Sequence, residues 1–309
     1  MWEMPGGLQD GHPDLETAKQ PGMYPVRRLY QGLSGTGDPK RALVSGEKEG
    51  GIKMDLTHAV RRFEEYLDDY DREDDKIRLK ITHTYGVMEY SKKIAERMEL
   101  STEDQTLAQI IGLLHDIGRF EQVKRYDSFE PGTMDHAGFG VEILFGEGLI
   151  REFVEEDTWD PVIRTAIAKH SDFRLEGIPD ERELLHAKII RDADKLDNCR
   201  VKLYDPVETF MGASAEEVGR DQISEEVMNE FRKKESIFSP LRKTKMDYWL
   251  SYLAYFFDIN FPASFAMIVE ENYLSRLEKR IPYTNPKTAE EMREVFETLD
   301  RFIREGAAR

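Results

Sequence analysis

Apolar residues recur at helical spacing along most of the chain from Leu56 onward. Leu56, Val60, Phe63 and Leu67, for example, are three or four residues apart, which places their side chains on one face of an α-helix. No segment of useful length alternates apolar and polar residues as a strand does. The pattern therefore predicts an all-α fold. Helices are expected to include residues 56–67, 88–98 and 107–114 and to cover residues 137–156, 160–170, 181–200, 214–236, 246–257, 263–280 and 288–305.

Local residues indicate where one of these helices begins and ends. Ser101 followed by Asp104 resembles a capping box, with Asp in the place usual for Glu or Gln, and opens the helix that leads to His115. Gly118 is expected to stop that helix just after the pair His115-Asp116.

The segment from Tyr248 to Val269 is apolar and long enough to cross a bilayer. Asp258, Asn260 and Pro262 interrupt it near its centre. Because such residues are unfavourable inside a membrane span, we interpret the segment as two buried helices separated at residues 259–262. No membrane partner is expected.

The first 53 residues differ from the rest of the chain. They contain ten of the 22 glycines and five of the 13 prolines, without helical or strand periodicity, so we expect a disordered leader. Lys48 to Gly51, just before Met54, can be encoded by a purine-rich run typical of a bacterial ribosome-binding site. Our hypothesis is that translation starts at Met54, and an ordinary flexible tail is the alternative. Residues 54–309 show no linker and no internal repeat, so we expect one domain there.

Charge and cysteine content narrow the class of protein. The chain of 309 residues is 39% hydrophobic and has a formal charge of −17, and such an acidic field repels phosphate backbones. Sequence-independent nucleic-acid binding is therefore not expected, although a metal cluster would reverse the sign locally and admit a small anion. Cys199 is the only cysteine, which excludes an internal disulfide and suggests a reducing compartment. We expect Cys199 to be a buried structural thiol. The N-terminus lacks a signal-peptide pattern, so we expect a cytoplasmic protein.

Several histidines lie in or against apolar helical patterns. His83 is in "KITHTYGVMEY", His115 in "GLLHDIGRF" and His170 in "RTAIAKHSDF". A single histidine of this kind is usually a hydrogen-bonded core residue. Several together, with carboxylates such as Asp116 nearby, fit a metal site better. Mixed nitrogen and carboxylate ligands suit Mn, Fe, Co, Ni or Zn more than Mg or Ca.

The order of these residues resembles the H…HD…H…H…D signature of the HD-domain metal-dependent phosphohydrolase superfamily. The blocks "LLHDIGR", "DHAGFGVEIL", "AIAKH" and "IIRDADKLDN" are similar to its motifs, and the resemblance covers about residues 56–200. It implies an HD-type helical bundle, here with additional C-terminal helices. It also implies a site for divalent transition-metal ions, which His136 and His170 would extend from one ion to two. With two ions, His83, His115 and Asp194 would hold one and His136 and His170 the other, with Asp116 shared.

Spacing alone would not select Asp194, because Asp192 and Asp197 share its expected helix. The resemblance selects it through "ADKL", and for Asp192 and Asp197 we expect capping or salt bridging. His186 is expected near the ligands or at the surface rather than among them.

The resemblance implies hydrolysis of a phosphate monoester or diester by hydroxide that the metal ions activate, with Asp116 as the catalytic residue. Arg119 and Lys195 follow the two motifs and are candidate clamps for the substrate phosphate, with ordinary solvated charge as an equal alternative. Lys169, Lys124 and Arg125 are weaker candidates. No residue can be assigned as the general acid.

The substrate expected from the resemblance is a small phosphate ester, with a nucleotide preferred. The doubled histidine and Gly-Tyr-Pro triplet of the HD-GYP branch are absent after His170, which counts against cyclic di-GMP. Two other functions stay open, a di-iron oxygenase on the same ligand set and a non-catalytic sensor of nucleotide or metal. The aromatic residues after Arg200 are expected in the core, with a substrate pocket or a homo-oligomer interface as alternatives. They include Trp249, Tyr252, Tyr255, Phe256 and Phe257.

Overall fold

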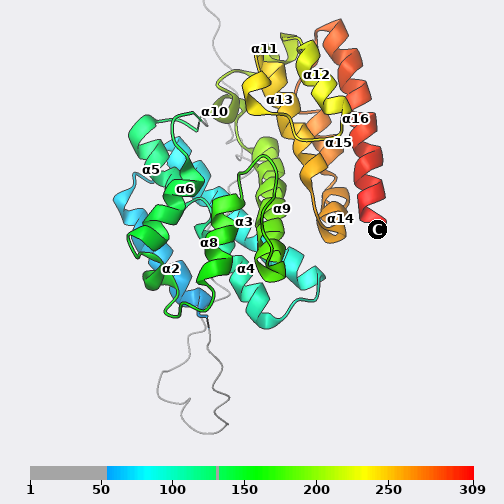
Figure 1. Cartoon of the computed structure of the whole chain (residues 1–309). Coiled ribbons are helices and arrows are strands. Elements are labelled where there is room, and N and C mark those ends of the chain that lie inside the picture. The colour runs from blue at the N-terminus through cyan, green and yellow to red at the C-terminus, as the bar shows by residue number, and fades with distance from the viewer. Residues whose placement is uncertain (1–53, 130–131) are drawn as a thin grey trace, which may run out of the picture. The chain divides into compact units, whose positions relative to one another are not determined.

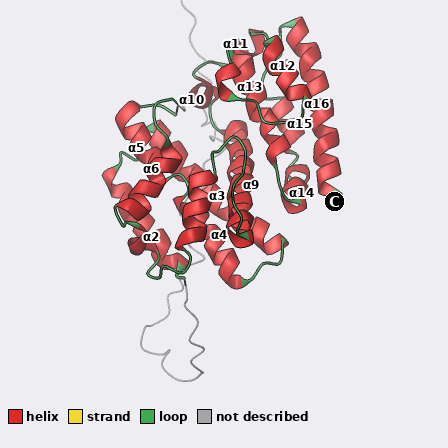
Figure 2. Ribbon diagram, viewed as in Figure 1, coloured by secondary structure: helices red, strands yellow, loops and turns green. Residues whose placement is uncertain are grey.

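The structure is a computed structural model that describes residues 54–129 and 132–309. Within these residues all regular structure is helical and no strand occurs, which confirms the predicted all-α fold (Figures 1 and 2). The expected leader, residues 1–53, lies outside the described part, and the extent of the domain, residues 54–309, stays a prediction. The α-helices are α2 (Leu56–Tyr66), α3 (Asp75–Arg97), α4 (Thr102–Leu114), α5 (Ile117–Tyr126), α6 (His136–Val141), α7 (Ile150–Phe153), α8 (Asp160–Lys169), α9 (Glu181–Tyr204), α10 (Val207–Met211), α11 (Ala215–Arg220), α12 (Glu225–Arg232), α13 (Lys245–Leu253), α14 (Pro262–Glu270), α15 (Tyr273–Glu278) and α16 (Pro286–Ala307).

Helix α9 is the element on which the other helices converge. It packs against α3, α4 and α8 from the first part of the chain and against α14 and α15 from the last part. Asp180 caps its N-terminus by accepting hydrogen bonds from the amides of Arg182 and Glu183. Because α9 has neighbours on several sides, it buries apolar side chains such as Ile190 and Leu196 together with charged ones. This explains its weak sequence periodicity.

Three helices expected as continuous are interrupted. Residues 137–156 form α6, a π-helix η2 (Glu142–Gly146) and α7, with Gly148 at a φ of 84° between η2 and α7. This left-handed conformation ends a helix and favours glycine. Residues 263–280 divide at Asn272, whose φ is 51°.

The third interruption, within residues 214–236, separates α11 from α12. Ser214 and Glu217 form a capping box that starts α11, and Ser224, at the start of α12, donates its amide to Asp247 of α13 at 2.8 Å. A contact with a distant helix therefore determines where this break falls. The spacing of apolar residues within the segment does not predict it.

The apolar segment 248–269 is two helical stretches, as predicted. Helix α13 continues into a 3-10 turn η4 (Ala254–Asp258), and α14 starts with Pro262 in its first turn. The carboxylate of Asp192 in α9 accepts hydrogen bonds from the backbone amides of Asn260 and Phe261 and from the Asn260 side chain. Asp192, for which capping or salt bridging is expected, thus binds the two backbone amides that lead into α14, whose N-cap Phe261 has no side-chain cap bond. No helix among the described residues has the length and apolar character that crossing a bilayer requires.

The helix that leads to the His-Asp pair begins as predicted but ends differently. Ser101 accepts a hydrogen bond from the amide of Asp104 at 3.1 Å, although its hydroxyl donates to the Asp104 carboxylate, so only half of the capping box forms. The helix ends at Leu114, before the pair, and Gly118 lies inside the next helix, α5. The prediction that Gly118 stops the helix is therefore wrong. Its role is close packing, because a Cβ atom there would collide with the carbonyl oxygen of His136.

Candidate metal centre

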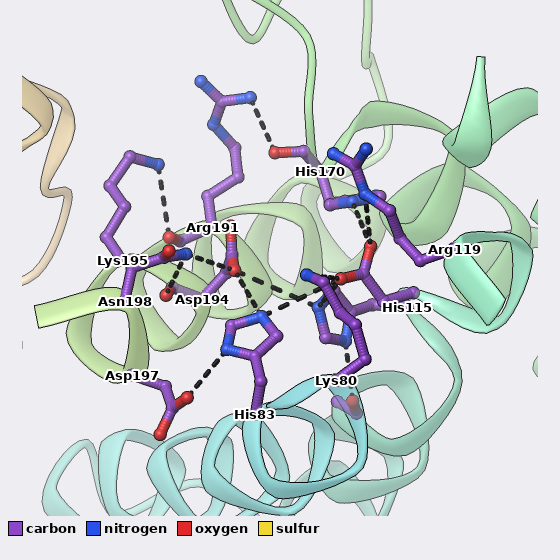
Figure 3. A network of polar contacts seen from close by, with 12 residues as sticks. Lys80, His83, His115, Arg119, His170, Arg191, Asp194, Lys195, Asp197 and Asn198 are labelled. Carbon is purple, nitrogen blue, oxygen red and sulfur yellow. Dashed lines mark hydrogen bonds and ion pairs between the residues drawn. The ribbon is translucent and has the colours of Figure 1, made fainter. Parts of the chain in front are cut away.

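Five helical segments each supply part of one buried cluster, and Figure 3 shows the contributions of His83, His115, His170 and Asp194. His83 lies in the middle of α3 and Asp194 in the middle of α9. His115 and Asp116 form the corner between α4 and α5, where the chain leaves one helix and enters the next. His136 is the first residue of α6, and His170 is the C-terminal capping residue of α8. The structure thus brings together all six residues that the sequence predicts as metal ligands.

The carboxylate of Asp116 divides the cluster into two groups of donors. Its Oδ2 atom lies 3.8 Å from Nε2 of His83 and 3.6 Å from Nε2 of His115. Its Oδ1 atom lies 3.6 Å from Nε2 of His136 and 3.5 Å from Nε2 of His170. Each oxygen therefore faces a different pair of imidazoles. In each group of three residues the candidate ligand atoms all lie within 4.8 Å of one another.

Asp194 adds a second carboxylate to the first group only. Its Oδ1 atom is 3.0 Å from Nε2 of His83 and 4.0 Å from Nε2 of His115. The first group is thus two imidazoles and two carboxylates. The second is two imidazoles, whose Nε2 atoms are 3.1 Å apart, and the shared carboxylate.

Hydrogen bonds to the far ring nitrogen orient three of the four histidines. Nδ1 of His115 lies 2.8 Å from the carbonyl of Gly112, and Nδ1 of His170 lies 2.7 Å from the carbonyl of Ile167. A carbonyl only accepts, so each Nδ1 carries the proton and each Nε2 presents its lone pair to the cluster. Nδ1 of His83 lies 2.7 Å from Oδ2 of Asp197, and this carboxylate oxygen accepts its hydrogen bond. Such carboxylate and carbonyl partners are typical of metal-ligating histidines.

Two buried nitrogen atoms without a hydrogen bond give evidence, independent of the sequence motif, that the donor set fits a transition-metal ion. The Nε2 atoms of His83 and His115 are buried and make no hydrogen bond, although both face carboxylates. A buried polar nitrogen without a hydrogen bond is costly, and coordination to a cation satisfies it. Imidazole nitrogens with carboxylate oxygens suit Mn, Fe, Co, Ni and Zn.

Two cationic side chains flank Asp116, one beside each oxygen. Nζ of Lys80 lies 2.7 Å from Oδ2, and Nε of Arg119 lies 3.6 Å from Oδ1. Burial raises the pKa of Asp116, but Lys80, His115, His170 and Arg119 outweigh it and hold that pKa well below its usual range. Asp116 is therefore an anion. Burial also lowers the pKa of His115 to about 4, so this histidine is neutral near pH 7, as a ligand must be.

Lys80 and Asp197 are parts of the site that sequence reasoning missed. Lys80 lies three residues before His83 on α3 and so shares its helix face, which is the one signal that could have found it. Asp197 forms an expected salt bridge, to Arg200, but its bond to His83 was not foreseen.

The two predicted phosphate clamps are placed differently. Arg119 lies beside the cluster, where it donates to Gln122 at 2.6 Å. Lys195 is buried and pairs with Asp258 at 2.8 Å and with the carbonyl of Arg191 at 3.2 Å. Within the described residues no hydrogen bond or ion pair joins Lys195 to the cluster.

The weaker clamp candidates are all paired with nearby acids. Lys169 lies 2.8 Å from Asp172. Lys124 and Arg125 lie 3.8 Å and 2.8 Å from Glu121. These ion pairs are local to the helices that carry them.

His186 is neither near the ligands nor at the surface. It is buried, and its Nε2 lies 3.0 Å from the carboxylate of Asp104 in the first turn of α4. His186 is not among the candidate ligand groups of the described residues, but its expected place near them or at the surface is wrong, because it lies two turns before Asp194 on α9 and ties α9 to the far end of α4.

Cys199 and the C-terminal aromatic residues largely follow expectation. Cys199 is buried, and burial raises the pKa of its thiol to about 12, as befits a structural thiol. Trp249 and Phe256 are buried in the core. Tyr252 and Tyr255 line a small cavity together with Lys202 of α9.

Comparison with known proteins identifies the central part of the chain. Residues 81–199 match the family model of the HD domain. No curated protein and no solved structure matches the chain.

Proposed function

Because residues 81–199 form an HD domain, the hallmark of a superfamily of metal-dependent phosphohydrolases, we propose that this protein hydrolyses a small phosphate ester, with a nucleotide as substrate, at a dinuclear metal centre. The observation that carries the proposal is the position of Asp116, whose two oxygens face two separate pairs of imidazoles at 3.5–3.8 Å. The nucleotide rests on the resemblance alone.

The two groups of donors differ in the number of protein ligands, so the two ions would have different roles. His83, His115, Asp194 and one oxygen of Asp116 would hold the first ion, and His136, His170 and the other oxygen of Asp116 would hold the second. Three protein ligands leave more positions open for other groups than four do, as is usual in catalytic sites. Ions bound here would make hydroxide available near neutral pH and neutralise charge on a phosphoryl group.

Lys80 and Arg119 are suited to bind the substrate phosphate. Both are partly exposed beside Asp116, and each would lose an electrostatic partner once the Asp116 oxygens are engaged by cations. The planar guanidinium of Arg119 can bind two phosphate oxygens, and the ammonium of Lys80 provides a point charge. Since Asp258 already neutralises Lys195, we propose Lys80 in its place as the second clamp.

The test is a panel of 5′-, 3′- and cyclic nucleotides incubated with the manganese-loaded full chain. Products are separated by chromatography, which detects opening of a cyclic diester as well as release of phosphate. Hydrolysis is expected for the native protein, and its loss in Asp116→Asn. Asp104→Asn, which alters a carboxylate bound to the remote His186, should retain it.

Other outcomes would redirect the assignment. Oxygen consumption by iron-loaded protein without cleavage of any phosphate ester would favour an oxygenase. Nucleotide binding without turnover, in protein that holds two ions, would favour a sensor.

A further inference from the structure

A buried arginine of α9 holds the end of the helix that carries His170. Nη1 of Arg191 donates to the backbone carbonyls of Lys169 at 3.1 Å, His170 at 3.2 Å and Asp172 at 2.6 Å. The last carbonyls of an α-helix have no partner within the helix, and a cation there also interacts favourably with the helix dipole. Arg191 therefore fixes the backbone at which α8 ends, and Figure 3 shows it reaching the backbone oxygen beside the His170 ring.

Arg191 is itself held by a residue that follows the motif region, residues 56–200, in which the HD-type motifs lie. Its Nη2 atom donates to Oδ2 of Asp258, in η4, at 2.6 Å, and the same oxygen lies 2.8 Å from Nζ of Lys195. Arg191 and Lys195 are both at least nine-tenths buried. Buried cations are costly without a counter-charge, and Asp258 supplies it for both. The carboxylate also sets the direction in which the Arg191 guanidinium points.

We propose that Asp258 is a positioning residue for His170, so that the helices after the motif region complete the second metal position. The path runs from Asp258 through the Arg191 guanidinium to the carbonyls of residues 169–172 and hence to the His170 ring. This inference rests on the dinuclear centre proposed above, and it assigns a role to a C-terminal segment that the motif region does not contain.

The second metal position, which includes His170, needs support from Arg191 and Asp258 more than the first position does. His115 and Asp116 are held between two consecutive helices, and His83 and Asp194 lie in the middle of long ones. His170 instead lies at a helix end that continues into residues 171–180, which form no regular helix. The hydrogen bond from Nδ1 of His170 to the carbonyl of Ile167 orients the ring. Because both partners belong to the same helix end, this bond does not fix the ring if the helix end itself moves.

Asp192 provides a matched control, because it anchors the same C-terminal segment by a different route. It lies next to Arg191 on α9, is fully buried, and accepts hydrogen bonds from Asn260 and Phe261. Among the described residues, its carboxylate forms no hydrogen bond with residues 169–172. Asp192→Asn therefore weakens the hold on residues 260 and 261 and leaves in place both the Asp258–Arg191 ion pair and the hydrogen bonds from Arg191 to residues 169–172.

The experiment is calorimetric titration of the metal-free full chain with Mn²⁺, in the native protein and in Asp258→Asn and Asp192→Asn. Thermal unfolding of the metal-free variants establishes that both are folded and how far each is destabilised. Two ions are expected to bind the native protein, and Asp258→Asn should weaken one of them by about 10–100-fold, the usual effect of losing an outer partner of a ligand. Asp192→Asn should bind both ions as the native protein does.

Unchanged binding of both ions in Asp258→Asn would overturn the inference while leaving the dinuclear centre intact. Equal weakening of both ions, or equal losses in the two variants, would overturn it as well, because the effect would then be general destabilisation. Binding of only one ion by the native protein would overturn the dinuclear centre itself, and this inference with it.

Discussion

At the scale of single residues, three of the four histidines in the candidate centre are oriented by an atom that does not face the cluster. The carbonyls of Gly112 and Ile167 orient His115 and His170, and the carboxylate of Asp197 orients His83. Asp197 is fully buried and is held in turn by Arg200 through two hydrogen bonds. The arrangement lets Asp197 orient a candidate ligand, His83, although Asp197 is not itself one of the six candidates.

Replacement of Asp197 by asparagine should weaken the first ion. The neutral amide is a poorer partner for Nδ1 of His83 and lowers the basicity of its Nε2, so affinity for Mn²⁺ should fall by about 10–100-fold. Calorimetric titration measures this directly. Asp104→Asn is the matched control, since Asp104 forms the same kind of bond with a buried histidine, His186, that is not a ligand. Equal metal affinity in native protein and Asp197→Asn would contradict the role of Asp197.

The sequence predicts the residues that meet at this centre but not the contacts that hold them. The ordered motif identifies six positions, and all six converge. Lys80 and Asp197 could not be identified in the same way, because many charged residues on α3 and α9 lie within a turn of a ligand. Which of them turns inward depends on helix packing, and a pattern of spacings along one chain does not contain that information.

At the scale of elements, the centre depends on how closely neighbouring helices approach. Helices α5 and α6 pack together where Gly118 faces the backbone of His136. No side chain fits between them, so the glycine permits the contact that brings His136 to the cluster. In the sequence Gly118 is only a glycine near a motif, and a glycine in that place is typical of a helix end.

Gly118→Ala should therefore displace His136 and destabilise the protein. A Cβ atom there would collide with backbone, which cannot yield as a flexible side chain can, and overpacking of this kind costs about 1–3 kcal/mol. Thermal unfolding and Mn²⁺ titration together should show a lower melting temperature and loss of the second ion. Gly140→Ala, on the facing helix, is the control because its Cβ atom would meet Ile117 at an ordinary 3.4 Å. Two ions bound by Gly118→Ala with native affinity would contradict this account.

The contact between α4 and α9 predicts a pH dependence of stability. Burial lowers the pKa of His186 from its usual 6.5, although Asp104 partly opposes this. Below pH 6.5 the unfolded chain therefore binds a proton that the folded chain excludes, and stability is lost as pH falls. Denaturant unfolding of the metal-free protein between pH 6.5 and 5 should show this loss.

His186→Asn isolates the contribution of this histidine. Burial shifts the pKa of His115 and of His136 in the same direction, and both remain in the variant. The free energy of unfolding should therefore fall less steeply with decreasing pH in His186→Asn than in the native protein. Identical slopes would show that His186 does not titrate differently in the two states.

At the scale of the whole molecule, the helices after Arg200 are bound to the motif region through buried polar contacts. Asp192 holds Asn260 and Phe261, and Asp258 holds Arg191 and Lys195. These bonds join α9 to η4 and to the start of α14. The sequence indicates that the C-terminal segment is helical and broken near Pro262, but its dependence on α9 comes from contacts about 68 positions apart in the chain.

Residues 54–309 should accordingly unfold as one unit. Trp159 lies at the start of α8 and Trp249 in α13, and both are buried, so each reports on one part of the fold. In a Trp2→Phe background, Trp159→Phe and Trp249→Phe leave one reporter each. In each variant the fluorescence midpoint in denaturant should coincide with the far-UV circular dichroism midpoint. Separate midpoints would show that the C-terminal helices form a domain of their own.

The most direct test of the central claim is hydrolysis of a phosphate ester measured against the number of Mn²⁺ ions bound to each chain. The claim predicts that hydrolysis rises with occupancy of the second position, between His136 and His170, and that Asp116→Asn, which lacks the shared carboxylate, shows none at any metal concentration. Native protein with two ions bound that cleaves no phosphate monoester or diester, or that cleaves one equally well without metal, would contradict it.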